Sequence, residues 1–260
     1  MASKTKKGKS LCIFSAKGGV GKTITTLNLA GIFKAIGKKV LIIDLDLSSG
    51  GIAVALNIET NKDIFQLSED LINNRYNDFK NYVANYDEDI DFIASPKDPR
   101  QMTKMEARYI ELIIEKASFL YDVILIDTNH FLNDINLLAL DMADKILFIT
   151  TNDPMDLKNL KSLLSIFRDE NITKYKVLLN NSKNPYKEFF SEADMKNILR
   201  SNIDYILSQK MFIKNIDNYI MNGKIITLLP KMPTTFAKDY ATLTTIAIDL
   251  LDGGNQNEEK

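Results

Sequence analysis

The sequence is poor in several features that would mark a secreted or membrane-spanning chain. Its 260 residues include one cysteine, Cys12, so an internal disulfide framework is excluded. Cys12 lies in the first apolar run, and we expect it in the core. No uninterrupted apolar run is long enough to span a bilayer. Four lysines fall within residues 1–10, but the apolar stretch of a secretory signal does not follow them. These absences predict a cytoplasmic protein.

A strong charge of either sign is also missing. The formal net charge is −1 and the isoelectric point is about 6.0, so no broad basic surface announces a nucleic-acid partner. The hydrophobic content of 45% is sufficient for one substantial core. We expect one domain over residues 10–252, with flexible polar tails at residues 1–9 and 253–260.

Short apolar runs alternate with helical patterns along the chain. A helix is predicted over residues 101–118, and another begins where Asp153 can cap it ahead of Pro154. The runs are near-continuous rather than alternating, which is typical of strands covered on both faces. The pattern therefore predicts a single α/β domain with a mainly parallel sheet and helices on both faces. The predicted strands are residues 11–14, 39–44, 90–94, 123–127, 145–150, 176–180 and 225–229.

The glycine-rich segment Ala16–Thr23 is the most informative part of the sequence. It joins a predicted strand to a helical pattern, and such a turn directs backbone N–H groups and a helix N-terminus toward one point. Lys22 is placed to reach the β- and γ-phosphates of a nucleotide, and the Thr23 hydroxyl to ligate Mg²⁺. Glycine at 18, 19 and 21 allows the backbone to approach an anion closely.

Acidic residues at predicted strand ends form a second constellation. Asp44 and Asp46 follow one strand and Asp127 ends another. Ligands of open α/β sheets bind outside the carboxyl ends of the strands, where the glycine-rich turn also lies. We therefore expect these three carboxylates to share a crevice with Lys22 and Thr23.

The pattern K-G-G-x-G-K-T, with Lys17 ahead of the glycines, resembles the deviant P-loop of the MinD/ParA superfamily of ATPases. Ala16 stands where the common P-loop has glycine, so the strict G-x-x-x-x-G-K-[ST] pattern is not met. The resemblance covers about residues 10–251. It implies ATP and Mg²⁺ as cofactors, and an ATP-dependent homodimer in which Lys17 reaches the partner's nucleotide.

The resemblance also assigns roles to single residues. Asp46 matches the residue that orients or deprotonates the attacking water, Asp44 supports the Mg²⁺ shell, and Asp127 is the Walker B carboxylate. Asn180 matches the residue that pairs with the adenine edge, although a turn role is open to it. His130 is expected in a switch loop without a catalytic role. The predicted catalytic residues are Lys17, Lys22 and Asp46. The predicted nucleotide-binding residues are Lys17, Gly18, Gly19, Val20, Gly21, Lys22, Thr23, Ile24, Asn180, Pro230 and Met232. The predicted metal-binding residues are Thr23, Asp44 and Asp127.

Three branches of the superfamily compete. MinD-like proteins carry a basic membrane-targeting helix, whereas the last helical pattern here, residues 236–250, has one lysine and is expected to dock on its own core. ParA-like proteins usually read D-x-D-P-Q after the second strand, which this chain lacks. The segments 44–56, 94–96 and 126–133 resemble the CpaE/TadZ group, which helps to localise pilus and secretion machinery.

The sequence thus favours a slowly hydrolysing, Mg²⁺-dependent ATP switch that dimerises and positions a Tad or type IV pilus or a secretion apparatus, at a cell pole or the nucleoid. One alternative is a ParA-type partition ATPase that binds DNA non-specifically. Another is an ATP-binding scaffold with negligible hydrolysis. A DNA-binding patch would draw on Lys183, Lys187, Lys196, Arg200, Lys210 and Lys214.

Overall fold

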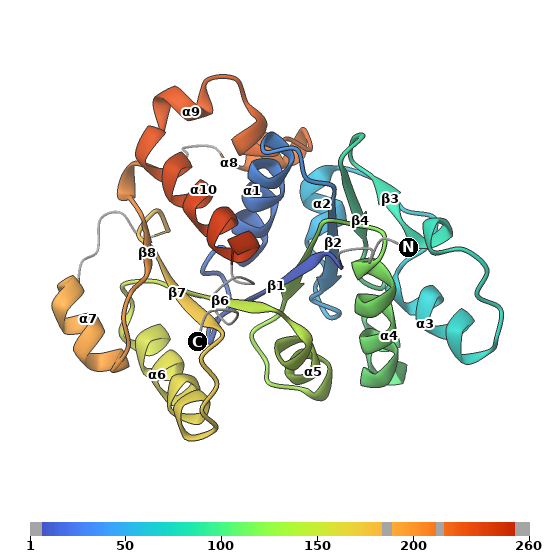
Figure 1. Cartoon of the computed structure of the whole chain (residues 1–260), viewed down its shortest axis with the longest axis horizontal. Coiled ribbons are helices and arrows are strands. Elements are labelled where there is room, and N and C mark those ends of the chain that lie inside the picture. Colours follow the sequence, from blue (N-terminus) through green and yellow to red (C-terminus); the bar gives the residue numbers. More distant parts are fainter. Residues whose placement is uncertain (1–6, 184–188, 212–215, 253–260) are drawn as a thin grey trace, which may run out of the picture.

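In a computed structural model of the chain, which describes residues 7–183, 189–211 and 216–252, helices pack on both faces of an eight-stranded sheet (Figure 1). The strand order is β3-β4-β2-β5-β1-β6-β7-β8. Every neighbouring pair is parallel except β3 and β4. The strands are β1 Lys9–Phe14, β2 Val40–Leu45, β3 Ala84–Asn85, β4 Ile90–Ile93, β5 Val123–Thr128, β6 Lys145–Thr150, β7 Tyr175–Asn180 and β8 Tyr205–Leu207.

The central strands are buried along their whole length. All six residues of β2 and all six of β5 are buried, which explains their near-continuous apolar sequences. One face of the sheet is covered by α3 Ile64–Ile72, α4 Ala107–Ser118, α5 Asp134–Met142, α6 Pro154–Asp169 and α7 Glu192–Leu199. The other is covered by α1 Lys22–Ala35, α2 Ile52–Leu56, α8 Ile216–Met221, α9 Met232–Thr235 and α10 Ala237–Asp252. The predicted fold class is confirmed.

Six of the seven predicted strands are present, and one is wrong. The run 225–229 contains the 3-10 helix η4, Ile226–Leu228, in place of a strand. Its carbonyl groups bond locally, since the amide of Leu228 donates to Ile225 O and that of Leu229 to Ile226 O. The segment packs on α1, where a Cβ at Gly31 would lie 2.2 Å from Thr227 Oγ1. A short apolar run cannot by itself distinguish a strand from a buried helical turn.

Two short strands, β3 and β8, were not predicted, because each has only two or three residues. The predicted helix over 101–118 is divided. A 3-10 helix, η2 Pro99–Lys104, comes first, and α4 begins only at Ala107 because Met105 and Glu106 have extended backbone. The predicted start of α6 is confirmed: the Asp153 side chain accepts hydrogen bonds from the amides of Met155 and Asp156.

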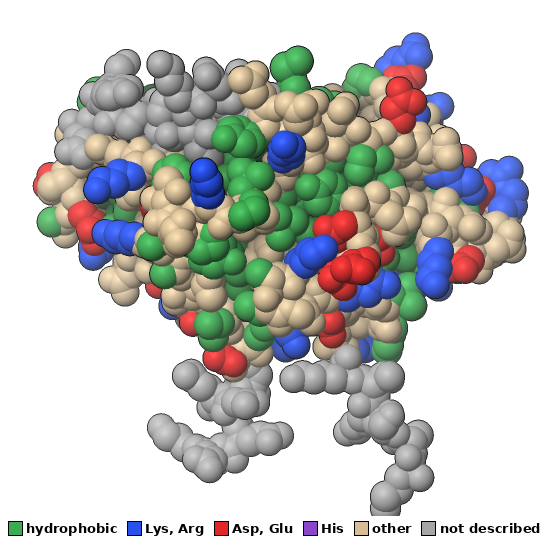
Figure 2. All heavy atoms as spheres, turned by 90° about the horizontal axis from the view of Figure 1, so that it is seen from above, with side chains coloured by type: hydrophobic (Ala, Val, Ile, Leu, Met, Phe, Trp, Pro, Cys, Tyr) green, Lys and Arg blue, Asp and Glu red, His purple; other side chains and the backbone are tan. Residues whose placement is uncertain are grey.

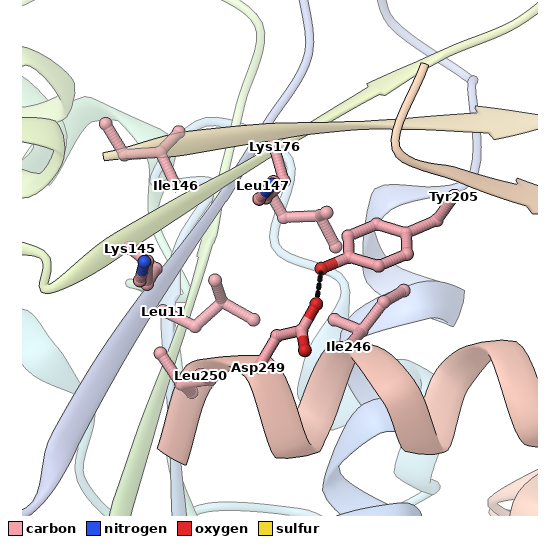
Figure 3. Close-up of a pocket in the computed structure, with 9 residues that line it drawn as sticks. All are labelled: Leu11, Lys145, Ile146, Leu147, Lys176, Tyr205, Ile246, Asp249 and Leu250. Carbon is pink, nitrogen blue, oxygen red and sulfur yellow. Dashed lines mark hydrogen bonds between the residues drawn. The ribbon is translucent and has the colours of Figure 1, made fainter. Parts of the chain in front are cut away.

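The last helix docks on the protein's own core, as predicted. Leu243, Ile246 and Leu250 of α10 are buried against the sheet. Beneath the helix, the Tyr205 hydroxyl on β8 donates a hydrogen bond to Asp249, and the pair lies beside an apolar pocket (Figure 3). In the described part of the chain, no helix is long and apolar enough to cross a membrane.

The face formed by α8, α9 and α10 lies at the top of Figure 1 and is seen directly in Figure 2. Hydrophobic side chains gather across its middle, with charged side chains of both signs around them. Two large apolar residues on these helices, Met221 and Ile248, are exposed.

Residues 7–9 of the predicted N-terminal tail are described. Lys9 is the first residue of β1, and the amide of Gly8 donates to Ser118 O at 2.7 Å. The remaining residues of the predicted tails, 1–6 and 253–260, lie outside the described residues.

Candidate functional site

The glycine-rich turn connects the carboxyl end of β1 to the N-terminus of α1. Gly19 and Gly21 have left-handed backbone, with φ of 76° and 101°. A Cβ at Gly21 would lie 2.7 Å from Asn180 Nδ2. The left-handed backbone and this close contact both exclude a side chain at position 21. No side chain caps α1, and its first turn holds no acidic residue. The first amides of α1 therefore remain available to an anion, which fits a phosphate group.

Lys22 is held at this helix N-terminus. Its Nζ donates to Ser15 Oγ at 2.8 Å, and Ser15 Oγ donates to Lys17 O at 2.7 Å. Burial lowers the pKa of Lys22, while the nearby carboxylate of Asp127 acts in the opposite direction. The ammonium group is thus preorganised beside carboxylates, and a bound phosphate would give it a closer counter-charge.

Thr23 and Asp127 meet directly. Thr23 Oγ1 donates to Asp127 Oδ2 at 2.7 Å, and Thr26 Oγ1 lies 3.2 Å from Asp127 Oδ1. Because the Thr23 hydroxyl gives its hydrogen to the carboxylate, its lone pairs remain free for a cation. Among the described residues, no three His, Cys, Asp or Glu side chains cluster as a metal cage. A Mg²⁺ ion here would be held by Thr23 together with phosphate oxygens and water, as this ion commonly is.

Asp44 and Asp127 lie on neighbouring strands, paired in the β2–β5 register, and both are almost completely buried. Burial, with a smaller contribution from the adjacent Asp44, raises the pKa of Asp127 to about 7, against the lowering effect of Thr23 and Lys22. Burial likewise raises the pKa of Asp44 to about 6, against the lowering effect of its backbone hydrogen bonds. Two buried acids without a cation favour protonation, so the pair is suited to a site that a divalent cation completes.

Asp44 has a role that the sequence did not reveal. Its Oδ1 accepts the amide of Asp46 at 3.1 Å, and its Oδ2 accepts those of Gly51 and Ile52 at 2.9 and 3.1 Å. It therefore holds both ends of the loop that carries Asp46. Asp46 is half-buried, and its Oδ1 accepts from Ser48 Oγ and the amide of Ser49, which leaves Oδ2 without a partner among the described residues.

Lys17 lies at the start of the turn and contacts a different partner from Lys22. Its Nζ is 3.0 Å from Asp153 Oδ1, and its side chain is 42% exposed. The sequence predicted Asp153 only as a helix cap. Its second contact could not be found from spacing, because 136 positions separate the two residues and only the adjacency of β1 and β6 brings them together.

Asn180 ends β7 and contacts the turn from the other side. Its Nδ2 donates to Val20 O at 2.9 Å, and its Oδ1 accepts the amide and hydroxyl of Ser182. One amide hydrogen of Asn180 has no partner in the described part of the chain. Of the other residues predicted for the base, Pro230 is exposed and Met232 is buried in the core.

The remaining predicted residues surround the turn. Val20 is buried, and Ile24 is half-buried in the first turn of α1. His130 lies on Gly18, because a Cβ there would be 3.5 Å from the imidazole, and its ring packs against Phe131 with centroids 4.0 Å apart. The structure therefore brings the phosphate-facing and metal-facing candidates together at one edge of the sheet.

The basic residues considered for DNA are only partly available. Lys196 is paired with Glu192 at 2.6 Å, and Arg200 ends α7 with a left-handed backbone. Lys183 and Lys210 are exposed, whereas Lys187 and Lys214 lie outside the described residues.

Comparison with known proteins identifies relatives of this site and fold. Residues 8–181, about two thirds of the chain, match the family described as AAA domain. The septum site-determining protein MinD of Bacillus subtilis is 23% identical over 195 residues, covering 74% of this chain and 72% of that protein. The chain spans between 52% and 72% of the length of three curated relatives that it matches.

Two solved structures share the fold. A ParA family ATPase from Chlorobium tepidum has a TM-score of 0.78 at 19% identity, covering 94% of this chain and 99% of that one. The MinD protein from Pyrococcus horikoshii, solved with Mg-ADP, has a TM-score of 0.77 at 18% identity, covering 94% and 98%.

Proposed function

Because the chain belongs to the MinD/ParA superfamily of P-loop ATPases, we propose that it is a Mg²⁺-dependent, slowly hydrolysing ATP switch that dimerises and positions a cellular machine. The observation that carries this proposal is the convergence of Lys22, Thr23 and Asp127 at an uncapped helix N-terminus behind two left-handed glycines. The MinD structure from Pyrococcus horikoshii was solved with Mg-ADP, which supports the choice of ligand.

Each side chain has a distinct task in this proposal. The amides of the turn and the Lys22 ammonium bind and neutralise the phosphates. Thr23, hydrogen-bonded to Asp127, would ligate Mg²⁺, and the ion would add further charge neutralisation. Asp46, with one free carboxylate oxygen at the same edge, orients the water that attacks the terminal phosphate. Catalysis of phosphoryl transfer depends mainly on positioning the reactants and stabilising charge, and the protein has little covalent chemistry to perform.

Lys17 serves the partner subunit. Its side chain is partly exposed at the start of the turn and forms an ion pair with Asp153. When two copies meet face to face with ATP, Lys17 leaves Asp153 and contacts the partner's phosphates. Loss of the terminal phosphate removes this contact and releases the dimer.

Three variants test the mechanism. Lys22→Ala should abolish binding of a fluorescent ADP. Lys17→Ala should keep ADP binding and lose the ATP-dependent dimer in light scattering, and an ordinary dimer from this variant would refute the cross-subunit role. Asp46→Ala should accumulate an ATP-bound dimer with slowed phosphate release, and unchanged hydrolysis would remove Asp46 from its role. Lys80→Ala, an exposed lysine on η1 (Phe79–Tyr82), is the control.

The machine to be positioned is a pilus or secretion apparatus in our proposal, on the basis of the resemblance to the CpaE/TadZ group. A second candidate is a partition ATPase, which the fold shared with a ParA family ATPase favours. Retention of the ATP form on an arbitrary DNA duplex, lost as salt rises, would support partition. An ATP-specific dimer that ignores DNA would support the first candidate. A dimer with no measurable phosphate release would indicate a scaffold.

A further inference from the structure

A groove borders the phosphate-binding turn and the segments that follow β6 and β7. It is lined by Lys17, Gly18, Gly19, Val20, Thr151 and Lys183. Lys183 is exposed and has no anionic partner among the residues that the structure describes. Two lysines and the backbone of the glycine turn therefore line one groove. Lys22 is not among its lining residues.

The residues before Lys183 are linked to the turn by a chain of hydrogen bonds. The amide and the hydroxyl of Ser182 donate to Asn180 Oδ1 at 3.2 and 2.6 Å. Asn180 Nδ2 in turn donates to Val20 O at 2.9 Å. The backbone directly before Lys183 is thus tied to the phosphate-binding turn through two links.

Thr151, which lines the groove beside β6, is held in place by Asp156. The amide and hydroxyl of Thr151 donate to Asp156 Oδ2 at 2.7 and 2.8 Å, and Asp156 is fully buried. The other nearby carboxylate, Asp153, is bound to Lys17 and to the amides that start α6. The groove therefore presents two lysines, of which Lys17 is paired with the half-buried Asp153. Its chemistry suits a phosphate-bearing ligand.

We infer that Lys183 is a second cross-subunit cation, which contacts the phosphates of the nucleotide bound to the other copy of the chain. This inference rests on the proposed ATP-dependent dimer. Lys22 and the start of α1, which the proposed function assigns to the subunit's own phosphates, are not among the residues that line this groove. In a two-fold dimer the same patch of each subunit faces its counterpart, so a side chain that shares a groove with Lys17 faces the same partner nucleotide.

The test compares wild type with Lys183→Gln, with Lys183→Arg as the conservative variant and Lys80→Gln as the matched control. Sedimentation velocity measures dimer dissociation with Mg²⁺ and a non-hydrolysable ATP analogue, and fluorescent ADP measures binding to the monomer. Lys183→Gln should weaken the dimer about tenfold, equivalent to about 1.4 kcal/mol, and leave ADP affinity within about twofold. Lys183→Arg should restore the dimer, and Lys80→Gln should resemble wild type.

The failures are distinguishable. If wild type forms no dimer with the analogue, the proposed function fails and the inference fails with it. If wild type and Lys183→Gln dimerise equally well, the inference alone is overturned. If Lys183→Gln loses salt-sensitive retention on DNA and keeps its dimer, the groove binds DNA phosphates, and the inference is equally overturned. Weaker ADP binding by the monomer would place Lys183 on its own nucleotide, against the cross-subunit role.

Discussion

Replacing Asp153 with asparagine should strengthen the ATP-dependent dimer. In the monomer, Lys17 Nζ lies 3.0 Å from Asp153 Oδ1, and the two side chains are 42% and 24% exposed. Solvent screens such a pair, so its contribution is about 0.5–1 kcal/mol. Each of two subunits must break this pair before Lys17 can cross the interface. Removing both pairs therefore favours the dimer by about 1–2 kcal/mol, or roughly 5- to 30-fold in the dissociation constant.

The change is conservative for the fold. Asp153 also accepts the amides of Met155 and Asp156 at 3.0 Å each, and an asparagine oxygen can accept both. The monomer should lose only the ion pair, which lowers the melting temperature by about 1–4 °C. Sedimentation velocity with Mg²⁺ and a non-hydrolysable ATP analogue measures the dimer, and thermal unfolding measures the monomer.

Asp87→Asn is the matched control. Lys34 Nζ lies 2.9 Å from Asp87 Oδ2, with the side chains 24% and 25% exposed, and Asp87 Oδ1 accepts the amides of Asp89 and Ile90. This variant should lose similar stability and keep the wild-type dimer, because its ion pair lies outside the phosphate-binding turn. If Asp153→Asn leaves the dimer unchanged or weakens it, Lys17 does not exchange Asp153 for the partner, and the reasoning is refuted.

Three further predictions concern a buried carboxyl group, a left-handed glycine and a hydrogen bond under the last helix. Asp127 has a pKa of about 7 against an ordinary 3.8, so the ligand-free folded protein binds more protons than the unfolded chain between these values. Its free energy of unfolding in urea should fall as pH rises through this window, and Asp127→Asn should flatten that fall; an equally steep fall would exclude Asp127 as its source. Gly21→Ala should abolish binding of fluorescent ADP, because φ is 101° and the Asn180 amide is 2.7 Å from the new Cβ. Gly37→Ala, with φ of 73° and open space, should keep binding and cost about 1–2 kcal/mol of stability; equal binding by both variants would argue against the crowding at Gly21. Tyr205→Phe should lower the free energy of unfolding by about 1 kcal/mol and speed amide exchange in α10, whereas unchanged exchange would mean that this hydrogen bond does not hold the helix.

Much of the fold was predictable because the signals were local. Continuous apolar runs gave six strands, and the Asp153-Pro154 pair marked the start of α6. The failures also have local causes. The run 225–229 is apolar enough for a strand, yet η4 packs on α1 through Gly31. The weak alternation of residues 205–207 gave no sign of β8, which depends on pairing with β7.

The phosphate-binding turn can be recognised from the order of the amino acids alone. Three glycines, a lysine and a threonine in fixed order between a strand and a helix dictate backbone freedom, charge and a metal ligand within eight residues. The sequence also placed Asp44, Asp46 and Asp127 at strand ends, since parallel strands bring their carboxyl ends to one edge.

The contacts that hold these groups in place depend on the packing of the whole domain. The contacts Thr23–Asp127, Lys17–Asp153 and Asn180–Val20 join residues more than 100 positions apart in the chain. They exist because the strand order places β5 and β6 on either side of β1, with β7 next to β6. Hydrogen bonds and ion pairs act over a few ångströms, so their partners depend on the packing of the whole sheet and cannot be deduced from spacing along the chain.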